Sequence, residues 1–345
     1  MKNFKITNFR IGKNFPVFTI AEAGINHNGS FKIAKKMIDV AKKSGVNCIK
    51  FQTHITEKEM IKSNIKPGNI SKKSLWSIIK NCELTESEEE KLQEYCKTKK
   101  LLFLSTPFSN EAVDRLEKIN MPAYKIGSGE LTNIPFLHHI AKTNKPVILS
   151  TGMSTINEIK EAVKIFKKYN TPIALLQTTS IYPTEYKDVK LGGIETLQKI
   201  FNLPVGISDH SIGIYTALGA VAKGACIVEK HFTIDKNMPG PDQKLSLEPN
   251  ELSELVKGCQ AVKLALGDRK NILAGEKPIL KFARESVVSI HEINKGEKFT
   301  HENISTKRPG TGSISAKEYF QLIGKKAKRK ILFDKQLSWS DVNIK

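Results

Sequence analysis

Eight short apolar runs recur through the first two-thirds of the chain, and each is followed by a polar residue. The runs are Val17–Ile20, Asn47–Ile49, Leu101–Leu104, Ala123–Tyr124, Val147–Leu149, Ile173–Leu176, Val205–Ile207 and Cys226–Val228. Amphipathic segments separate most of them, and strands that alternate with helices indicate a parallel sheet. Eight such units predict an α/β fold, a closed (β/α)8 TIM barrel. The carboxyl ends of barrel strands meet in one mouth, where active sites are found. We therefore expect the polar residues after the runs to gather there.

The length suits one barrel and a smaller C-terminal domain. The chain has 345 residues, whereas a barrel takes about 250. The apolar pattern changes to short alternating segments after the last predicted barrel helix. We predict a barrel over residues 1–267, a linker over 268–282 and a small, mostly β domain over 283–345. We predict that residues 4–18 form a hairpin that closes the end of the barrel opposite the mouth.

Composition argues against several classes of protein. No apolar run approaches the roughly 20 residues of a membrane span, and the first residues lack the pattern of a signal peptide. Five cysteines without CxxC spacing argue against a disulfide framework or a zinc site. The net charge is +20, but only six of the 55 basic residues are arginine and the lysines are scattered. Nucleic-acid sites cluster their charge and use arginine. We expect a cytoplasmic protein with neither nucleic acid nor membrane as partner.

Two lysines at predicted strand ends indicate an anionic substrate. Lys125 and Ser128 belong to the string KIGSGE, whose glycines let backbone amides approach an anion. Lys50 ends a neighbouring strand. Burial of a lysine costs free energy unless its charge is neutralised, so the expected ligand carries a phosphate, or a phosphate and a carboxylate. The alternative is that the lysines pair with Glu22 or Glu229.

Two histidines indicate a metal ion. His210 and His231 end two sequence-adjacent strands, which lie about 5 Å apart in a barrel. Imidazoles so placed can bind one divalent ion, with water and a substrate oxygen completing its shell. Two histidines are fewer than a tight zinc site needs, which favours an exchangeable ion such as Mn²⁺ or Mg²⁺. The alternative is a pair of structural histidines.

The strand-end strings, taken together, resemble the sialic acid synthases, which condense phosphoenolpyruvate with a sugar of the N-acetylmannosamine type. The shared motifs, in order, are EAGINHNG from Glu22, KFQTH from Lys50, STPF from Ser105, KIGSGE from Lys125, STGM from Ser150, IYPT from Ile181, GISDH from Gly206, EKHFT from Glu229, GPD from Gly240 and KRPG from Lys307. The resemblance runs from about residue 15 to 335. It implies that the C-terminal domain is an antifreeze-like SAF domain of the β-clip type.

The resemblance implies roles for individual residues. Phosphoenolpyruvate would be held by Lys50, Lys125, Ser128, Ser150 and Ser208. The metal ligands would be His210 and His231, with Mn²⁺ expected and Mg²⁺ or Co²⁺ as alternatives. The sugar contacts would be Gln52, Asn69, Thr106, Phe108, Tyr182, Asp242 and Arg308. Arg308 would come from the C-terminal domain of a second subunit, which implies a homodimer. Apart from the resemblance, we expect Glu22 to transfer a proton because it projects from its strand into the mouth, and Lys50 and Lys125 to stabilise the phosphate by their fixed placement.

The predicted activity is that of a transferase, an N-acetylneuraminate synthase. It would join phosphoenolpyruvate, N-acetylmannosamine and water, and release phosphate by C–O cleavage. Ser180 and Phe51 depart from residues found in some N-acetylneuraminate-forming members and lie near the expected sugar. A legionaminate synthase acting on 2,4-diacetamido-2,4,6-trideoxymannose is therefore the alternative. A non-catalytic protein that binds polyanions or ice would leave the strand-end lysines, histidines and glutamate unexplained.

Overall fold

Eight parallel strands form a nearly closed barrel in the first of two compact units, residues 1–267 and 268–345. The computed structural model describes residues 3–66, 73–267 and 270–343. The hydrogen-bonded order of the strands is β5-β4-β3-β10-β9-β8-β7-β6, and β5 also lies against β6. The strands are β3 (Phe18–Gly24), β4 (Cys48–Thr53), β5 (Leu102–Pro107), β6 (Tyr124–Ile126), β7 (Val147–Ser150), β8 (Ile173–Thr178), β9 (Val205–Asp209) and β10 (Ile227–His231). The predicted (β/α)8 barrel is confirmed.

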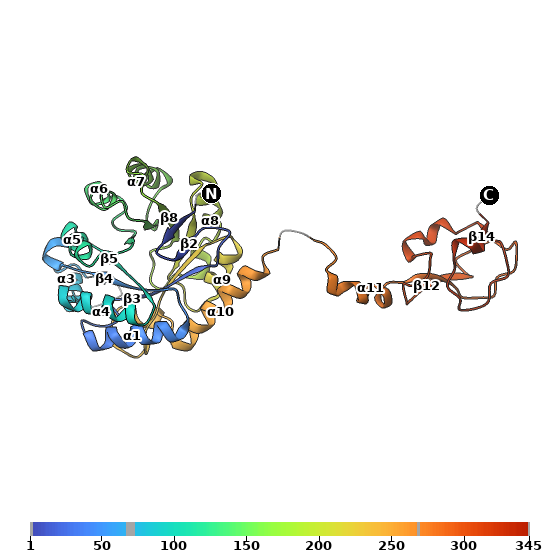
Figure 1. The fold of residues 1–345 in the computed structure, drawn as a ribbon, viewed down its shortest axis with the longest axis horizontal. Helices are drawn as coiled ribbons and strands as arrows, with labels where there is room; N and C mark the ends of the chain where they lie inside the picture. Colours follow the sequence, from blue (N-terminus) through green and yellow to red (C-terminus); the bar gives the residue numbers. More distant parts are fainter. Residues whose placement is uncertain (1–2, 67–72, 268–269, 344–345) are drawn as a thin grey trace. The chain divides into compact units, whose positions relative to one another are not determined.

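Helices surround these strands (Figure 1). They are α1 (Phe31–Ser44), α4 (Glu86–Thr98), α5 (Asn110–Lys118), α6 (Ile134–Ala141), α7 (Ile156–Lys168), α8 (Gly192–Phe201), α9 (Tyr215–Ala222) and α10 (Pro249–Ala265). Short helices α2 (Thr56–Glu59) and α3 (Leu75–Lys80) lie in the connection after β4, and η1 (Tyr186–Asp188) and η2 (Gln243–Leu245) in later loops. The side chains of Thr85 and Thr155 each cap a helix in a reciprocal capping box, which satisfies amides that have no partner within the helix.

The register of the sheet places residues far apart in the sequence side by side. The strands β3, β7, β9 and β10 are buried throughout, as expected for a parallel sheet covered by helices. Glu22 of β3 is the direct partner of Lys50 on β4 and of His231 on β10. Three predicted site residues therefore stand on three adjacent strands at the same level.

An N-terminal hairpin, β1 (Phe4–Ile6) with β2 (Phe9–Ile11), precedes the barrel. Ile6 and Ile11 are fully buried in the barrel core. No helix among the described residues is long and apolar enough to span a membrane.

The second unit has an apolar core of its own, which includes Val287, Phe299 and Leu337. Its elements are η3 (Ala274–Glu276), α11 (Lys277–Ala283), β11 (Ser286–Ser289), β12 (Ile304–Lys307), η4 (Ala316–Gln321), β13 (Lys326–Ala327), η5 (Trp339–Asp341) and β14 (Val342–Asn343). The segment expected to be a linker, residues 268–282, contains η3 and most of α11.

Candidate active site

A central hollow of about 550 Å³ opens at the carboxyl ends of the barrel strands. Most of the predicted site residues line it. They are Glu22, Lys50, Gln52, Thr106, Phe108, Lys125, Ser128, Ser150, Tyr182, Ser208, His210 and His231, joined by Leu75, Gly127, Gly129, Glu130, Met153, Thr178, Ser180 and Glu229. Successive side chains of a strand point to opposite faces, so residues two apart enter the hollow together. Lys50 with Gln52 and Glu229 with His231 are examples.

The floor of the central hollow is a cluster of two lysines and two glutamates, all buried. Lys50 Nζ lies 2.5 Å from a carboxylate oxygen of Glu22 and 3.7 Å from one of Glu229. Lys125 Nζ lies 3.3 Å from the other oxygen of Glu229. The ion pairs considered as the alternative at the sequence level are therefore present. They neutralise both lysines without any bound anion.

Burial and these ion pairs act differently on the two carboxyl groups. Burial raises the pKa of Glu22 to about 7, because the loss of hydration outweighs the attraction of Lys50. Burial also acts to raise the pKa of Glu229, but Lys125 and Lys50 together lower it to about 2. Glu229 is thus the permanent anion of the cluster. Glu22 is the group able to exchange a proton near neutral pH.

Small polar groups stand beside this cluster. Ser128 Oγ accepts a hydrogen bond from the Gly152 amide at 3.0 Å, while Ser150 Oγ and Ser180 Oγ are buried without a hydrogen-bond partner among the described residues. A Cβ at Gly152 would come within 2.3 Å of Ser180 Oγ and 2.8 Å of Ser128 Oγ. Glycine therefore keeps these hydroxyls clear. Hydroxyls and a lysine around one open space suit an oxyanion.

The two histidines face each other with ring centroids 5.6 Å apart. His210 Nδ1 donates to the Thr179 carbonyl at 2.8 Å, so its Nε2 carries the lone pair. His231 Nδ1 has no hydrogen-bond partner in the described part of the chain and lies 3.9 Å from the Asp242 carboxylate. Burial lowers the pKa of both rings, which favours the neutral form that binds metal.

This donor set fits a loosely held divalent ion. Among the described residues no group of three or more His, Cys, Asp or Glu side chains is placed to hold a metal. Two neutral imidazoles leave most of the coordination shell to water and substrate oxygen. Such a shell suits Mn²⁺ better than a structural zinc ion.

Three predicted site residues lie outside this group. Asp242 does not line the central hollow, although its carboxylate approaches His231. Asn69 lies outside the described residues. Arg308 is exposed on the second unit.

Other residues depart from the sequence-level picture. Phe51, expected near the sugar, is instead a core residue: it is 1% exposed and stacks on Phe103. It alternates with Lys50 and Gln52 and so points away from the mouth. Glu229 was considered only as a possible ion-pair partner of the lysines, and Glu130 was absent from the predicted set. Strand alternation from His231 would have located Glu229, whereas Glu130 follows its strand by several residues and has no such signal.

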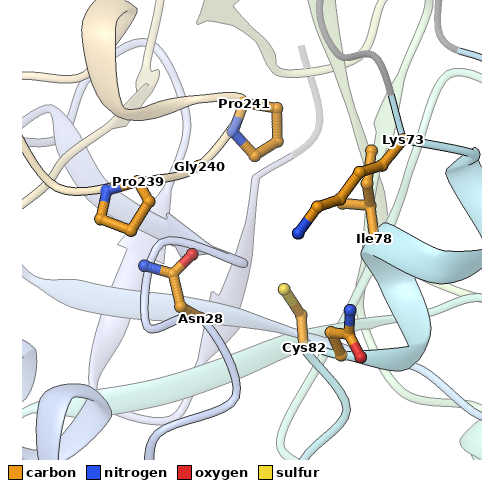
Figure 2. Close-up of a pocket in the computed structure, with 8 residues that line it drawn as sticks. Asn28, Lys73, Ile78, Cys82, Pro239, Gly240 and Pro241 are labelled. Atoms are coloured by element: carbon orange, nitrogen blue, oxygen red, sulfur yellow. The ribbon is translucent and has the colours of Figure 1, made fainter.

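A second hollow, of about 460 Å³, is drawn in Figure 2. It is lined by Asn28, Lys73, Ile78, Asn81, Cys82, Pro239, Gly240 and Pro241. The Cys82 thiol and the Lys73 ammonium point into it. Asp242, whose carboxylate approaches His231, directly follows Pro241 in the sequence.

Known families and proteins match the chain along most of its length. The model of the NeuB family matches residues 37–271, and that of the SAF domain matches residues 284–343. The chain belongs to the NeuB family. An N,N'-diacetyllegionaminic acid synthase of Campylobacter jejuni is 42% identical over 89% of this chain and 94% of its own length. A pseudaminic acid synthase of the same species is 39% identical over 98% and 99%. The structure of an N-acetylneuraminic acid (sialic acid) synthetase from Leptospira borgpetersenii, in complex with citrate, superposes with a TM-score of 0.74. It is 38% identical and covers 81% of this chain and 95% of that one. The three relatives carry the names of three different acids.

Proposed function

We propose that this NeuB family protein is a nonulosonic acid synthase that condenses phosphoenolpyruvate with the aldehyde form of an acetamido sugar and releases phosphate. The observation that carries the proposal is the central hollow itself. Two buried lysines, two neutral histidines and serine hydroxyls without a hydrogen-bond partner in the described ranges converge there from different barrel strands. Each class of group matches one part of the reaction.

The side of the hollow formed by β6 and β7 is suited to phosphoenolpyruvate. Lys125, Ser128 and Ser150 come from the ends of these strands and their loops. They offer one positive charge and two hydroxyls to phosphate or carboxylate oxygens. Lys50 donates to Thr106 Oγ1 at 2.9 Å and reaches the same floor from β4. Fixed donors of this kind stabilise charge that develops as the C–O bond to phosphate breaks.

The opposite side is suited to the aldehyde of the sugar. His210 and His231 would hold a divalent ion there, and such an ion polarises a carbonyl oxygen as a Lewis acid. Tyr182 stacks on His210 with ring centroids 4.2 Å apart and covers this side of the hollow. Tyr182 and His210 thereby limit how the sugar chain can lie.

Glu22 is the proposed proton-transfer group. It stands between the lysines and His231, since His231 is its direct partner on β10. Carbon 3 of phosphoenolpyruvate attacks the aldehyde, and water adds to carbon 2. The tetrahedral intermediate then loses phosphate. With a pKa of about 7, Glu22 can take a proton from that water as it adds to carbon 2 and give it to the alkoxide oxygen that forms from the aldehyde. Glu130, whose Oε2 is buried without a hydrogen-bond partner among the residues that the structure describes, is a further carboxyl group within the hollow.

We place 2,4-diacetamido-2,4,6-trideoxymannose first as acceptor, which would make the product a legionaminic acid. The rim of the hollow carries the apolar side chains of Leu75, Met153 and Tyr182, which are 40%, 74% and 36% exposed. These match the methyl groups of a deoxy sugar with two acetamido groups. The 42% identity to a legionaminic acid synthase agrees with this choice. N-acetylmannosamine, the acceptor predicted from sequence, is the second candidate because a sialic acid synthetase is 38% identical.

The deciding experiment measures phosphate release from phosphoenolpyruvate with Mn²⁺ and either sugar, and identifies the acid by mass spectrometry. We expect a higher kcat/KM with the diacetamido sugar. Preference for N-acetylmannosamine would reverse the choice of acceptor, and release with neither sugar would refute the proposal. Lys125→Gln should raise the KM for phosphoenolpyruvate. Lys223→Gln, which removes an exposed ion pair to Glu195, is the matched control.

We further propose that the enzyme acts as a homodimer in which Arg308 of one subunit contacts the sugar bound to the other. Arg308 is exposed on the SAF unit and therefore accessible to a second molecule. Light scattering should give twice the chain mass of 38.6 kDa. Arg308→Ala should raise the KM for the sugar and leave the KM for phosphoenolpyruvate unchanged. A fully active monomer would refute this arrangement.

A further inference from the structure

A line of hydrogen bonds leads from Glu22 away from the lysines to a buried carboxylate with no role in the proposed reaction. Gln52 Nε2 donates to Glu22 Oε1 at 3.3 Å, and Gln52 Oε1 lies 3.1 Å from His54 Nε2. His54 Nδ1 lies 3.0 and 2.9 Å from the two carboxylate oxygens of Glu59. The side chains of His54 and Glu59 are only 3% and 4% exposed. The line therefore runs through the protein interior.

The chemistry of these groups sets the direction of each bond. An ionised Glu22 can only accept, so Gln52 must turn its NH₂ toward it. The carbonyl oxygen of Gln52 then faces His54 and requires a hydrogen on Nε2. Glu59 in turn accepts from Nδ1.

The His54 ring is also held in place by packing. It stacks on the ring of Phe108, with centroids 4.5 Å apart and an angle of 14° between the planes. Phe108 lines the central hollow, whereas His54 lies behind it. An amide can turn by half a rotation at little steric cost, so only a fixed partner decides which end faces Glu22. The stacked ring supplies that partner.

We propose that His54 and Glu59 are positioning residues that fix the Gln52 amide with its NH₂ toward Glu22. Gln52 then holds the Glu22 carboxylate at the place where it exchanges a proton. This inference rests on the proposed function, because Glu22 is given its role there. His54 and Glu59 act through Gln52 and not by contact with the reacting atoms.

Two replacements of His54 separate positioning from a purely structural role. A Gln side chain can place its amide nitrogen near the position of ring Nε2, and an Asn side chain near that of Nδ1. His54→Gln thus keeps the donor to Gln52 and loses the contact with Glu59, whereas His54→Asn does the opposite. We expect kcat of His54→Gln to stay within about threefold of wild type and that of His54→Asn to fall about tenfold or more, the scale of one hydrogen bond to an ionic network. The KM for phosphoenolpyruvate should be unchanged in both.

A higher kcat for His54→Asn than for His54→Gln would overturn the proposal. That result would mean that the histidine is needed only to pair with Glu59, a contact that Asn preserves better than Gln. Equal activity of the two variants would also overturn the proposal. The control pair is His139→Gln and His139→Asn, since His139 pairs with Asp114 at 2.7 Å on the surface. Both control variants should match wild type.

Crystal structures of the two variants test the inference independently of activity. In His54→Asn the Gln52 amide should leave Glu22, while in His54→Gln it should keep its hydrogen bond. An unmoved Gln52 in the Asn variant refutes the positioning role. If wild type releases no phosphate with either sugar, the proposed function fails, and these structures still decide the role of His54.

Discussion

The buried ion pair between Asp209 and Lys230 offers the sharpest test of how the barrel holds its two histidines. The Asp209 carboxylate lies 2.9 Å from Lys230 Nζ, and the side chains are 0% and 1% exposed. Asp209 also accepts from the Ser211 amide at 2.9 Å and from Thr216 Oγ1 at 2.6 Å. The two residues directly precede His210 and His231 in sequence and are partners across β9 and β10. Asp209→Asn keeps the shape and removes the charge.

The expected cost follows from burial. Removing one partner of a buried ion pair costs about 3–5 kcal/mol, because the other charge is left without compensation. In a domain of this size each kcal/mol lowers the melting temperature by about 2–4 °C, so Asp209→Asn should melt roughly 10 °C below wild type. Burial already lowers the pKa of Lys230. Without Asp209 that pKa falls further below its unfolded value, so the unfolded chain binds more protons and the deficit should grow as pH falls.

The assay is calorimetry at several pH values, with circular dichroism to verify the fold. Asp209→Leu combined with Lys230→Met should recover most of the loss, because a buried ion pair and an apolar pair of similar volume are about equally stable. Glu195→Gln, which breaks an exposed pair with Lys223, should cost less than about 1 kcal/mol. A melting temperature of Asp209→Asn within about 2 °C of wild type would show that loss of the ion pair costs far less free energy of unfolding than expected.

Four further predictions concern the two hollows. If Glu22 accepts the proton, kcat/KM of wild type should fall as pH drops below about 7. Glu22→Gln should lack this limb and lose about 10²–10⁴ in kcat; an unchanged profile in the variant would assign the limb to another group. Because the pKa of Glu22 is raised in the folded state, its contribution to stability is present at acid pH and lost as pH rises through about 7, so Glu22→Gln should gain stability over wild type at pH 8 and not at pH 4. His231→Ala should weaken Mn²⁺ binding, measured by titration calorimetry, by more than about tenfold, because even the loss of an outer-shell partner of a metal ligand has an effect of that size. The control variant His139→Ala should bind Mn²⁺ as wild type does. Equal binding by the two variants would show that His231 is not a metal ligand. Burial raises the pKa of the Cys82 thiol to about 11 and also raises the pKa of the other four thiols. A disulfide reagent at pH 8 should therefore react without a rapid phase and should modify Cys82 first, through the second hollow. A rapid reaction of any other cysteine would contradict this prediction.

The sequence was sufficient to predict the strands and the residues that end them. A strand in a barrel with helices around it must be apolar, so its first polar residue marks the mouth. Lys50, Ser128 and His210 were placed correctly by this argument together with the resemblance to a family. Strand alternation, had it been applied throughout, would also have assigned Glu229 to the site and Phe51 to the core.

Other features depend on contacts that no sequence spacing reveals. His54 lies two residues beyond Gln52, yet its partner Glu59 comes from a short helix whose placement depends on tertiary packing. The partnership of Asp209 with Thr216 requires the start of α9 to fold back over β9. The identity of the acceptor sugar depends on rim side chains such as Met153, for which neither pattern nor periodicity gives a prediction.

The charge balance of the hollow links the sequence-level argument to the proposed chemistry. The sequence argued that Lys50 and Lys125 need an anion, and in the structure Glu22 and Glu229 already provide two. An incoming phosphate therefore adds negative charge to a cluster whose charges are already balanced, which favours protonation of one of the carboxylates. Glu229, with a pKa of about 2, stays ionised, whereas Glu22, with a pKa of about 7, can take up a proton at small cost. Glu22 is thus the carboxylate that accepts the proton in the later steps, while Glu229 keeps its charge. The carboxylates that balance the lysines and the group that transfers protons belong to one arrangement.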